Sequence, residues 1–312
     1  MQTATSVVKA LGAFVILAPA IQVQAAEISP FAAQAQVAYH AVPNITYLTA
    51  NNTDLKLDMY QARGQSAPQA TVIYIHGGGW TGGSKETNVL NLLPYMEMGW
   101  NVVNVEYRLA RVSVAPAAVE DCLCALRWVI RNAKEYNVDT SRIVVTGNSA
   151  GGHLALTTGM IPASAGLDRQ CPGPEELKVA AIVNWYGITD VADLLDGPNR
   201  RAYAVAWLGS IENRKEIATR VSPVTYVRPG LPPVLSIQGD ADPTVPYSHS
   251  VHLHAALEKA GVPNKLITVS GGLHGNFKPE EYPRLYTEIR DFLVKSNILR
   301  MLAPAVLPRR PE

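Results

Sequence analysis

The sequence carries little charge and no excess of either sign. Only 17% of its 312 residues are charged, and 27 Lys and Arg against 26 Asp and Glu leave a formal net charge of +1. A dedicated nucleic-acid-binding protein usually shows a basic excess or a basic stripe. Disordered chains combine low hydrophobicity with high net charge, whereas 47% of this chain is hydrophobic. We therefore expect a folded protein without a nucleic-acid partner.

Cysteine, internal repeats and long apolar runs are also scarce. The 23 Gly and 22 Pro residues follow no period, which excludes a collagen-like chain. A chain of this length buries roughly three quarters of its surface, so it folds without a disulfide framework. The apolar run at residues 10–20 is too short to span a bilayer comfortably. We expect no stable membrane anchor.

The apolar run belongs to a segment that is typical of a secretory signal peptide. A single lysine precedes it, and Val23 and Ala25 are small residues at the positions expected for cleavage. We expect cleavage after Ala25, which makes residues 1–25 a signal peptide and the protein secreted or periplasmic. A disordered or anchoring N-terminus is the alternative, because a single lysine is little positive charge for the first region of a signal peptide.

The pattern of residues 26–312 predicts a single α/β domain. Two extended segments within residues 42–60 come first and are expected to form an antiparallel edge. Apolar strands then alternate with helices, which favours a mostly parallel sheet with helices on both faces. The predicted strands span residues 70–77, 100–108, 141–149, 178–187, 232–240 and 264–272, and the main predicted helices span residues 85–98, 117–136, 150–159 and 280–296.

Two long excursions interrupt this alternation. Residues 161–176 form a loop rich in Pro and Gly, and residues 190–227 form a longer insertion with helical pieces. Long excursions inside compact α/β domains usually serve as lids or binding loops, so we expect a small lid at residues 190–227. The tail, residues 303–312, is expected to be extended or disordered.

The three cysteines leave two alternatives open. Cys122 falls on the apolar stripe of a predicted helix, whereas Cys124 lies two residues further along, toward the opposite face. Cys171 lies in the Pro- and Gly-rich loop. Either Cys124 and Cys171 form a disulfide or all three thiols stay unpaired, and the spacing gives no zinc pattern.

The strongest chemical signal is the pentapeptide that runs from Gly147 to Gly151, Gly-Asn-Ser-Ala-Gly. It follows a strand of β-branched residues and opens a helix, so its serine lies on a sharp turn that projects the hydroxyl outward. The flanking glycines permit this strained backbone. Ser149 is therefore the candidate nucleophile, and a tight turn with a capping serine is the alternative.

A glycine-rich loop, "HGGGW", follows the first predicted parallel strand. Consecutive glycines let backbone N–H groups converge on one point, which is what a developing oxyanion requires. We expect the N–H groups of Gly77, Gly78 and Ala150 to form this oxyanion hole. His76, the first residue of the loop, is expected to anchor it rather than to act as a base.

A serine hydroxyl needs a base to take its proton, and the base needs an orienting carboxylate. His274 lies in the Gly-flanked loop "GGLHGNF" after the last strand and is the candidate base. The turn "GDADPTVP" offers Asp240 and Asp242 as the acid. A loop residue reaches the histidine more easily than one held by the strand, which agrees in part with Asp242, the aspartate that the resemblance described below implies. Asp240 is expected to brace the turn.

Taken together, several segments resemble the α/β-hydrolase superfamily, on the esterase/lipase side that carries an HGGG oxyanion loop (the hormone-sensitive-lipase-like group). The candidate residues follow the order Ser, Asp, His that is expected of that fold. The sequence is most similar to compact, secreted bacterial esterases of the feruloyl- or acetyl-esterase type, over about residues 42–297. The segments are "HGGGWTGGSK", "VNVEYRLA", "AVEDCLCALRWV", "GNSAGGHLAL", "PPVLSIQGDADPTVPYSHS" and "GGLHGNF".

The resemblance implies a serine carboxylic-ester hydrolase that forms an acyl-enzyme and needs no metal or organic cofactor. Short-chain acyl or aryl esters are the implied substrates, such as acetyl or feruloyl esters of plant polysaccharides, whether small molecules or linked to a glycan. Little chain precedes the glycine loop, so the insertion must supply most of the lid. The implied site residues are Ser149, Asp242 and His274 for catalysis, Gly77, Gly78 and Ala150 for the oxyanion, and Trp80, Trp185 and Tyr186 for the pocket.

Other activities on the same fold are alternatives. An arylformamidase-like amidase has HGG-type loops too, and a peptidase is a further candidate, although peptidases of this fold usually carry a propeller or a large cap. A binding module without activity is disfavoured, because it would be expected to have lost the serine, the histidine or the aspartate.

Export gives a first prediction. In a host that secretes this protein, N-terminal sequencing should find Ala26 as the first residue, because signal peptidase cleaves after small residues at fixed positions. Recovery of a chain that still begins at Met1 from the cell interior would count against export.

Overall fold

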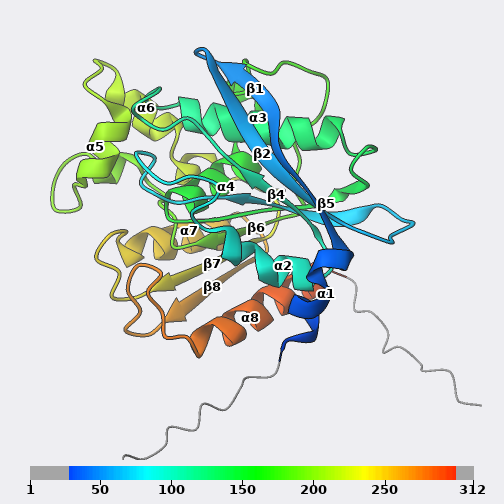
Figure 1. The fold of residues 1–312 in the computed structure, drawn as a ribbon. Helices are drawn as coiled ribbons and strands as arrows, with labels where there is room; N and C mark the ends of the chain where they lie inside the picture. The colour runs from blue at the N-terminus through cyan, green and yellow to red at the C-terminus, as the bar shows by residue number, and fades with distance from the viewer. Residues whose placement is uncertain (1–27, 300–312) are drawn as a thin grey trace, which may run out of the picture.

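A computed structural model describes residues 28–299, which build one eight-stranded sheet with helices around it (Figure 1). The predicted signal peptide and the tail at residues 303–312 lie outside the described residues. The strand order is β1-β2-β4-β3-β5-β6-β7-β8. The strands are β1 (Tyr39–Ala50), β2 (Thr53–Ala62), β3 (Gln69–Ile75), β4 (Asn101–Val105), β5 (Val138–Asn148), β6 (Ala181–Trp185), β7 (Val234–Gly239) and β8 (Asn264–Val269).

The sheet is antiparallel at one edge and parallel elsewhere. β1 pairs with β2, and β2 with β4, in antiparallel fashion, while the neighbours from β4 through β3 to β8 are parallel. Asn51 and Asn52 turn the chain between β1 and β2 with φ values of 51° and 54°, a conformation that asparagine tolerates better than most residues. The predicted antiparallel edge and mostly parallel sheet are confirmed.

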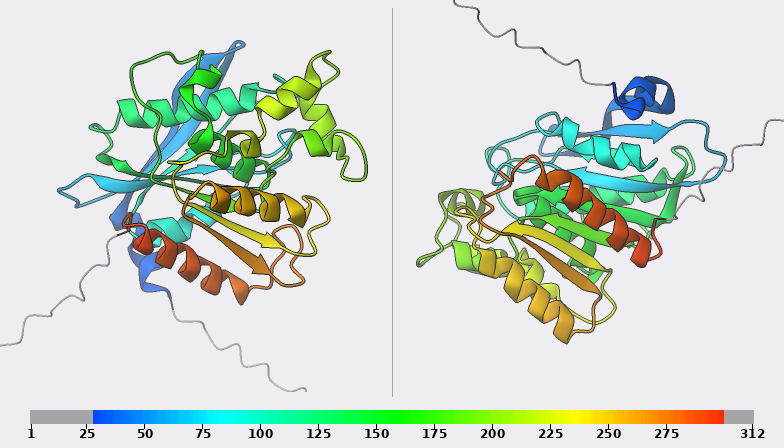
Figure 2. Two further views of the ribbon diagram at one scale, coloured as in Figure 1. Left: turned by 180° about the vertical axis from the view of Figure 1, so that it is seen from behind. Right: turned by 90° about the horizontal axis from the view of Figure 1, so that it is seen from below.

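Helices cover both faces of the sheet, as Figures 1 and 2 show. Ile73 and Val145 face the core under α3, α4 and α7, whereas Val72 and Val144 face the core under α2 and α8. Side chains alternate across a strand, so strands buried on both faces are continuously apolar. The helices are α1 (Pro30–Ala38), α2 (Leu93–Glu97), α3 (Ala117–Arg131), α4 (Ala150–Met160), α5 (Ala202–Leu208), α6 (Arg214–Arg220), α7 (Tyr247–Lys259) and α8 (Glu281–Lys295).

Helix α2 is much shorter than the helix predicted at residues 85–98. Only a 3-10 turn at Val89–Leu92 precedes it. Lys85 leaves the helical pattern because its ammonium group is drawn into a buried ion pair with Asp58, 2.9 Å away. A tertiary contact thus overrides the local helical preference of this segment.

A disulfide joins α3 to the Pro- and Gly-rich loop. Cys124 and Cys171 are bonded, with Cα atoms 5.6 Å apart, while Cys122 is buried and unbonded. Arg127, one turn further along α3, contacts Glu175 of the same loop at 3.2 Å. Of the two alternatives that the sequence left open, the structure has the disulfide.

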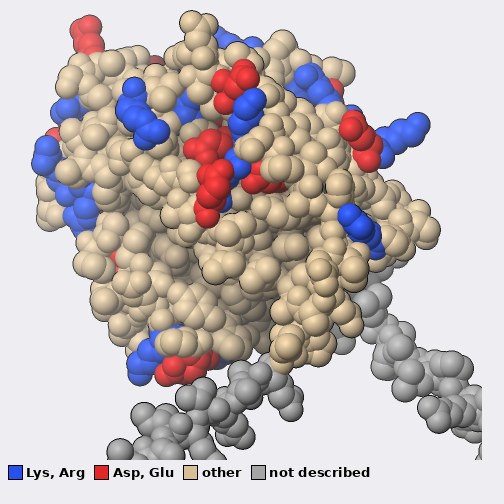
Figure 3. All heavy atoms as spheres, viewed as in Figure 1, with Lys and Arg blue, Asp and Glu red and all other residues tan. Residues whose placement is uncertain are grey.

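The insertion at residues 190–227 folds into α5 and α6 with two 3-10 turns, and Figure 1 shows both helices at one end of the sheet. Acidic and basic side chains lie close to one another on the face drawn in Figure 3. None of the helices within residues 28–299 is long and apolar enough to cross a membrane.

Candidate active site

Ser149 lies on a sharp turn between β5 and α4. Its backbone has φ 57° and ψ −120°, a strained conformation for a residue with a side chain. The two flanking glycines make the turn possible. A Cβ on Gly147 would lie 2.4 Å from the carbonyl oxygen of Ile75, and a Cβ on Gly151 would lie 2.0 Å from it. The turn of the candidate nucleophile is therefore packed directly against the end of β3.

His274 and Asp242 complete a hydrogen-bonded chain that starts at Ser149. His274 Nε2 lies 2.8 Å from Ser149 Oγ, and His274 Nδ1 lies 2.8 Å from Asp242 Oδ2. An ionised carboxylate only accepts hydrogen bonds, so Nδ1 carries the ring proton and Nε2 is left to accept the serine proton. This is the tautomer that a general base needs.

The side chain of Asp242 is buried and fixed in place. Its Oδ1 accepts hydrogen bonds from the backbone N–H groups of Thr244, at 2.8 Å, and Val245, at 3.0 Å. Gln238 Nε2 lies 3.4 Å from the other oxygen, Oδ2. These contacts hold the carboxylate in one orientation and leave Oδ2 directed at His274.

Asp240 has a different place in the structure. Its Oδ1 accepts the backbone N–H of Gly271 at 2.6 Å, and the N–H of Ala241 donates to the carbonyl oxygen of Gly272. Both contacts tie the turn after β7 to the loop after β8. The structure thus places Asp242 against the histidine and Asp240 between the two loops.

The glycine-rich loop presents Gly78 and Gly79 to the cavity at the nucleophile. Their φ values are 116° and 59°, and a Cβ on Gly78 would lie 2.1 Å from the carbonyl oxygen of Gly82, so glycine is required there. Gly77 is buried against Asn148 instead and does not line the cavity. The lining of the cavity favours the N–H groups of Gly78 and Gly79 as oxyanion donors, and the role of the Gly77 N–H stays a prediction.

Ala150 is the first residue of α4. The first N–H groups of a helix have no intrahelical partner, and they lie at the positive end of the helix dipole. The N–H of Ala150 is therefore suited, together with those of Gly78 and Gly79, to stabilise a negatively charged oxygen beside Ser149.

The cavity at the nucleophile has a volume of about 380 Å³. The insertion contributes Tyr203 to its wall, and the Tyr203 hydroxyl donates to the carbonyl oxygen of Thr244 at 3.2 Å. Arg201 Nε donates to the same oxygen at 2.9 Å, so the insertion buttresses the turn that carries Asp242. Sequence reasoning missed three of the lining residues. No local pattern links Tyr203 to the site, whereas Asn148 and Thr244 lie within the turns that carry Ser149 and Asp242 and could have been found there.

Of the three aromatic residues expected in the pocket, Tyr186 lines this cavity and packs edge-on against His274, with ring centroids 4.8 Å apart. Trp185 lines a smaller neighbouring cavity of about 60 Å³. Trp80 is completely buried and stacks on Trp207 at 4.1 Å. The expectation that Trp80 lines the pocket is corrected, because its side chain belongs to the core behind the loop.

A buried histidine anchors Trp80. Trp80 Nε1 donates to His153 Nδ1 at 3.2 Å, and His153 Nε2 donates to the carbonyl oxygen of Val221 at 2.7 Å. Burial lowers the pKa of His153 to about 4. The ring is therefore neutral at pH 7, which fits one accepting and one donating nitrogen. His153 so links the glycine loop to α4 and to the insertion.

Candidate metal ligands do not gather in the described part of the chain. His249 Nε2 faces Asp193 at 3.1 Å, and His249 Nδ1 accepts the backbone N–H of Thr189 at 3.3 Å. This contact ties α7 to the insertion. Within residues 28–299, no group of three or more His, Cys, Asp or Glu side chains is arranged to hold a metal ion.

Comparison with known proteins places the chain in a family. The sequence model of the BD-FAE family matches residues 57–257, which is more than half of the chain and includes Ser149 and Asp242. This chain belongs to the BD-FAE family. Together with the named relatives, the match confirms the resemblance to α/β-hydrolases of the esterase/lipase group.

Curated relatives of this BD-FAE protein are named as esterases. Esterase LipQ of Mycobacterium tuberculosis is 32% identical over 209 residues, which cover 64% of this chain and 48% of LipQ. An esterase of Gibberella moniliformis is 29% identical over 251 residues, which cover 76% of this chain and 74% of that protein. The chain spans about half the length of LipQ and of the related LipC.

Solved esterase structures share the fold. Est2 of Thermogutta terrifontis with propionate bound gives a TM-score of 0.70 at 27% identity, covering 85% of this chain and 97% of that one. A truncated carbohydrate esterase from gut microbiota gives a TM-score of 0.68 at 27% identity, covering 83% of this chain and 98% of that one. The predicted α/β-hydrolase fold is confirmed.

The hydrogen bonds predict separate roles for the two aspartates. Asp242→Asn should lower kcat on the order of 10⁴-fold, because an amide favours the wrong imidazole tautomer. Asp240→Asn should keep kcat and lose about 1 kcal/mol of unfolding free energy through a weakened hydrogen bond. Rates on p-nitrophenyl acetate and thermal unfolding measure both effects. An inactive Asp240→Asn beside an active Asp242→Asn would reverse the assignment.

The buried neutral His153 predicts a loss of stability in acid. Its pKa is about 4 in the folded protein against an ordinary 6.5, so the unfolded chain binds the proton more readily. Above about pH 6.5, His153 is neutral in both states and does not lower the free energy of unfolding. As the pH drops to about 4, the unfolded chain takes up the proton and the free energy of unfolding falls by about 3 kcal/mol in total.

Urea unfolding of the wild type and of His153→Gln at several pH values checks this. Glutamine still offers an acceptor and a donor but does not titrate. The wild type should therefore lose more unfolding free energy than the variant between neutral and acidic pH. Equal losses in the two proteins would show that His153 does not carry the effect.

Proposed function

We propose that this protein is a serine carboxylesterase, with Ser149 as nucleophile, His274 as general base and Asp242 as the residue that orients the base. The observation that carries the proposal is the pair of 2.8 Å contacts that link Ser149 to His274 and His274 to Asp242. Backbone N–H groups and a cavity at the same point add the other parts that acyl transfer requires.

In the first half of the reaction, His274 Nε2 takes the proton of Ser149 as the serine oxygen attacks the ester carbonyl carbon. The carbonyl oxygen becomes an oxyanion, which the N–H groups of the glycine loop and of Ala150 stabilise. Asp242 stabilises the imidazolium that forms. The imidazolium then gives its proton to the leaving alcohol, and an acyl-enzyme remains.

In the second half, His274 removes a proton from water while the water oxygen attacks the acyl carbon. The tetrahedral intermediate uses the same N–H groups as before. Its collapse breaks the bond to Ser149 Oγ, which regains its proton from His274, and the carboxylic acid leaves. Side chains and backbone groups of this chain carry out every step, without a metal or an organic cofactor.

The reactivity of a structural relative supports the serine mechanism. Thermogutta terrifontis esterase 2 is phosphonylated by sarin in one solved structure, at 28% identity to this chain and a TM-score of 0.72. Phosphonylation is the reaction expected of an activated serine. Ser149 is the residue of this chain on which we expect the same reaction.

Short-chain acyl or aryl esters are the proposed substrates. A cavity of about 380 Å³ with Tyr203 in its wall suits a small acyl group, and Est2 of Thermogutta terrifontis is known with propionate and with butyrate bound. Acetyl and feruloyl esters of plant polysaccharides are natural esters of this size class. The carbohydrate esterase among the structural relatives supports that choice.

We also propose that the protein is exported. Residues 1–25 have the pattern of a signal peptide. The Cys124–Cys171 disulfide is independent support, because disulfides persist in oxidising compartments and are rare in the cytosol.

A panel of p-nitrophenyl esters tests the activity and the substrate class together. Rates should be highest with acetyl, propionyl and butyryl esters and should fall gradually with length, because one methylene changes binding by only about 1–3 kcal/mol. N-formyl and p-nitroanilide substrates should react much more slowly, and Ser149→Ala is the inactive control.

Two outcomes of this panel would change the assignment. Activity that rises steadily past about 10 acyl carbons would contradict the role given to the insertion as a small lid, because each methylene is expected to change binding only modestly. Preferred hydrolysis of the N-formyl or anilide substrates would identify an amidase or a peptidase instead.

A further inference from the structure

A second, smaller cavity lies beside the cavity at the nucleophile. It has a volume of about 60 Å³ and shares Asn148 and Tyr186 with its larger neighbour. The two cavities therefore meet at these two side chains. The other walls of the second cavity come from β3, from the 3-10 turn before α2, from the end of β6 and from α8, and they are Tyr74, Asn91, Trp185, Tyr282 and Tyr286.

The walls of both cavities are polar. Among the described residues, no side chain built of carbon and hydrogen alone lines either cavity, and the residues without a side chain are Gly78 and Gly79. Small-molecule pockets are usually lined mainly by hydrophobic side chains with a few polar groups. A purely aliphatic ligand would leave these polar atoms without hydrogen bonds, which is costly away from bulk water. The walls favour a ligand that brings oxygen atoms of its own.

A directed chain of hydrogen bonds runs along the second cavity. Asn91 Nδ2 donates to the Tyr74 hydroxyl at 2.9 Å, and that hydroxyl donates to Asn148 Oδ1 at 3.0 Å. The amide nitrogen of Asn148 is thereby turned away from Tyr74, and the Asn148 side chain hydrogen-bonds to the Tyr186 hydroxyl. An amide nitrogen only donates. The Tyr186 oxygen is therefore the acceptor, and its own proton is left for another partner.

The backbone holds the Tyr186 hydroxyl close to the reacting groups. Tyr186 has φ 40°, a strained value for a bulky residue, and its N–H donates to the carbonyl oxygen of Ile237 at 2.7 Å. A Cβ on Gly275 would overlap the hydroxyl, so the hydroxyl lies beside the chain neighbour of the base. Burial raises the pKa of Tyr186 above its ordinary value, and the hydroxyl keeps its proton at neutral pH.

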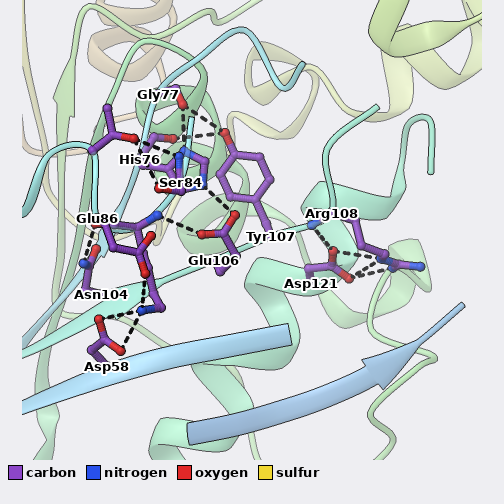
Figure 4. A network of polar contacts seen from close by, with 12 residues as sticks. Asp58, His76, Gly77, Ser84, Glu86, Asn104, Glu106, Tyr107, Arg108 and Asp121 are labelled. Carbon is purple, nitrogen blue, oxygen red and sulfur yellow. Dashed lines mark hydrogen bonds and ion pairs between the residues drawn. The ribbon is translucent and has the colours of Figure 1, made fainter. Parts of the chain in front are cut away.

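Other buried tyrosines near the site use their protons within the chain. Behind the glycine-rich loop, the Tyr107 hydroxyl donates to the carbonyl oxygen of His76 at 3.1 Å (Figure 4). In the wall of the second cavity, the Tyr282 hydroxyl donates to the carbonyl oxygen of Gly275 at 2.6 Å. Tyr186 differs, because no oxygen within residues 28–299 accepts its proton. This proton is available to a ligand in the cavities.

The mechanism decides which part of an ester reaches the second cavity. The leaving alcohol lies beside His274, because Nε2 must protonate its oxygen. The carbonyl oxygen lies at the N–H groups of the glycine loop. Among the described residues that line the second cavity, neither His274 nor the glycine loop is present, so the acyl group points toward it. A volume of about 60 Å³ has room for roughly two water-sized groups, which suits the end of a short acyl chain.

We propose that the Tyr186 hydroxyl is a specificity-determining donor that selects short acyl groups carrying a hydroxyl group. The proposal rests on the esterase function proposed above and narrows its substrates to esters of short hydroxy acids. The acyl hydroxyl accepts the Tyr186 proton, and the polar wall of the second cavity surrounds it. An acyl group with a methyl group in that place leaves the donor unpaired, and a site built around a hydrogen bond rejects such an analogue.

Matched esters test this donor. Each enantiomer of p-nitrophenyl 3-hydroxybutyrate is compared with p-nitrophenyl 3-methylbutyrate, in which a methyl group replaces the hydroxyl on the same carbon. The wild type should prefer one enantiomer, because a fixed donor reaches a hydroxyl on only one side of the chain. Tyr186→Phe keeps the ring and removes the donor. Its kcat/KM should fall roughly tenfold more for the preferred enantiomer than for the methyl ester.

Tyr95→Phe is the matched control. The Tyr95 hydroxyl is buried beside Thr146 Oγ1, 3.3 Å away, and Tyr95 lines neither cavity. This variant should change the rates on all three esters by the same factor. Tyr74→Phe removes the hydrogen bond that orients Asn148, so it should lower the preference for the hydroxy ester by a smaller factor than Tyr186→Phe.

A second pair of substrates carries the hydroxyl groups in the alcohol instead. Rates on 2,3-dihydroxypropyl butyrate and on propyl butyrate should fall by the same factor in Tyr186→Phe. A selective loss of the dihydroxypropyl ester would overturn the proposal, because the donor would then bind the leaving alcohol. Equal losses on the hydroxyacyl and methylacyl esters would overturn it as well, since a purely structural role of Tyr186 has that result.

Binding of the product acids makes the test independent of turnover. Saturation-transfer NMR compares the affinities of 3-hydroxybutyrate and 3-methylbutyrate. The wild type should bind the hydroxy acid roughly tenfold more tightly, and Tyr186→Phe should lose this difference. Equal affinities in the wild type overturn the inference whatever the activity. Selective binding of the hydroxy acid by a protein that hydrolyses no ester would contradict the proposed function alone.

Discussion

The close packing of the Ser149 turn against the end of β3 is the constraint on which the site depends. Gly147 and Gly151 let the turn lie against the carbonyl of Ile75, where any Cβ would overlap that oxygen. The glycine loop leaves β3 at the next residue, so the same contact sets the distance between the nucleophile and the loop N–H groups. Neighbouring parallel strands deliver both segments to one edge of the sheet.

The other half of the site repeats this arrangement at β7 and β8. A Cβ on Gly239 would lie 2.0 Å from the carbonyl oxygen of Gly272, so the turn with Asp242 and the loop with His274 lie in contact. The insertion holds the acid turn from outside through Arg201. Each group that the proposed chemistry needs is thus fixed by a backbone contact near a strand end, as preorganised catalysis requires.

Residues with a local signature could be predicted, and residues placed by distant contacts could not. The serine, the histidine and the aspartate each follow an apolar strand in a Gly-rich turn, and the structure places them together. Three consecutive glycines look alike in the sequence. It does not show that Gly78 and Gly79 line the cavity whereas Gly77 is buried. Trp80 follows the loop like a pocket residue, but stacking in the core takes it away. Lys85 begins a segment with a helical pattern, but its ion pair with the distant Asp58 holds it outside any helix.

The central claim is that His274 and Asp242 make Ser149 nucleophilic. Reaction with a fluorophosphonate, followed by intact-mass analysis and peptide mapping, tests it most directly, because such a reagent marks the activated residue covalently. One adduct per chain is predicted, on Ser149, with none in Ser149→Ala and a rate on the order of 10³-fold lower in His274→Ala. An adduct on another residue, or undiminished labelling of Ser149→Ala, would contradict the claim.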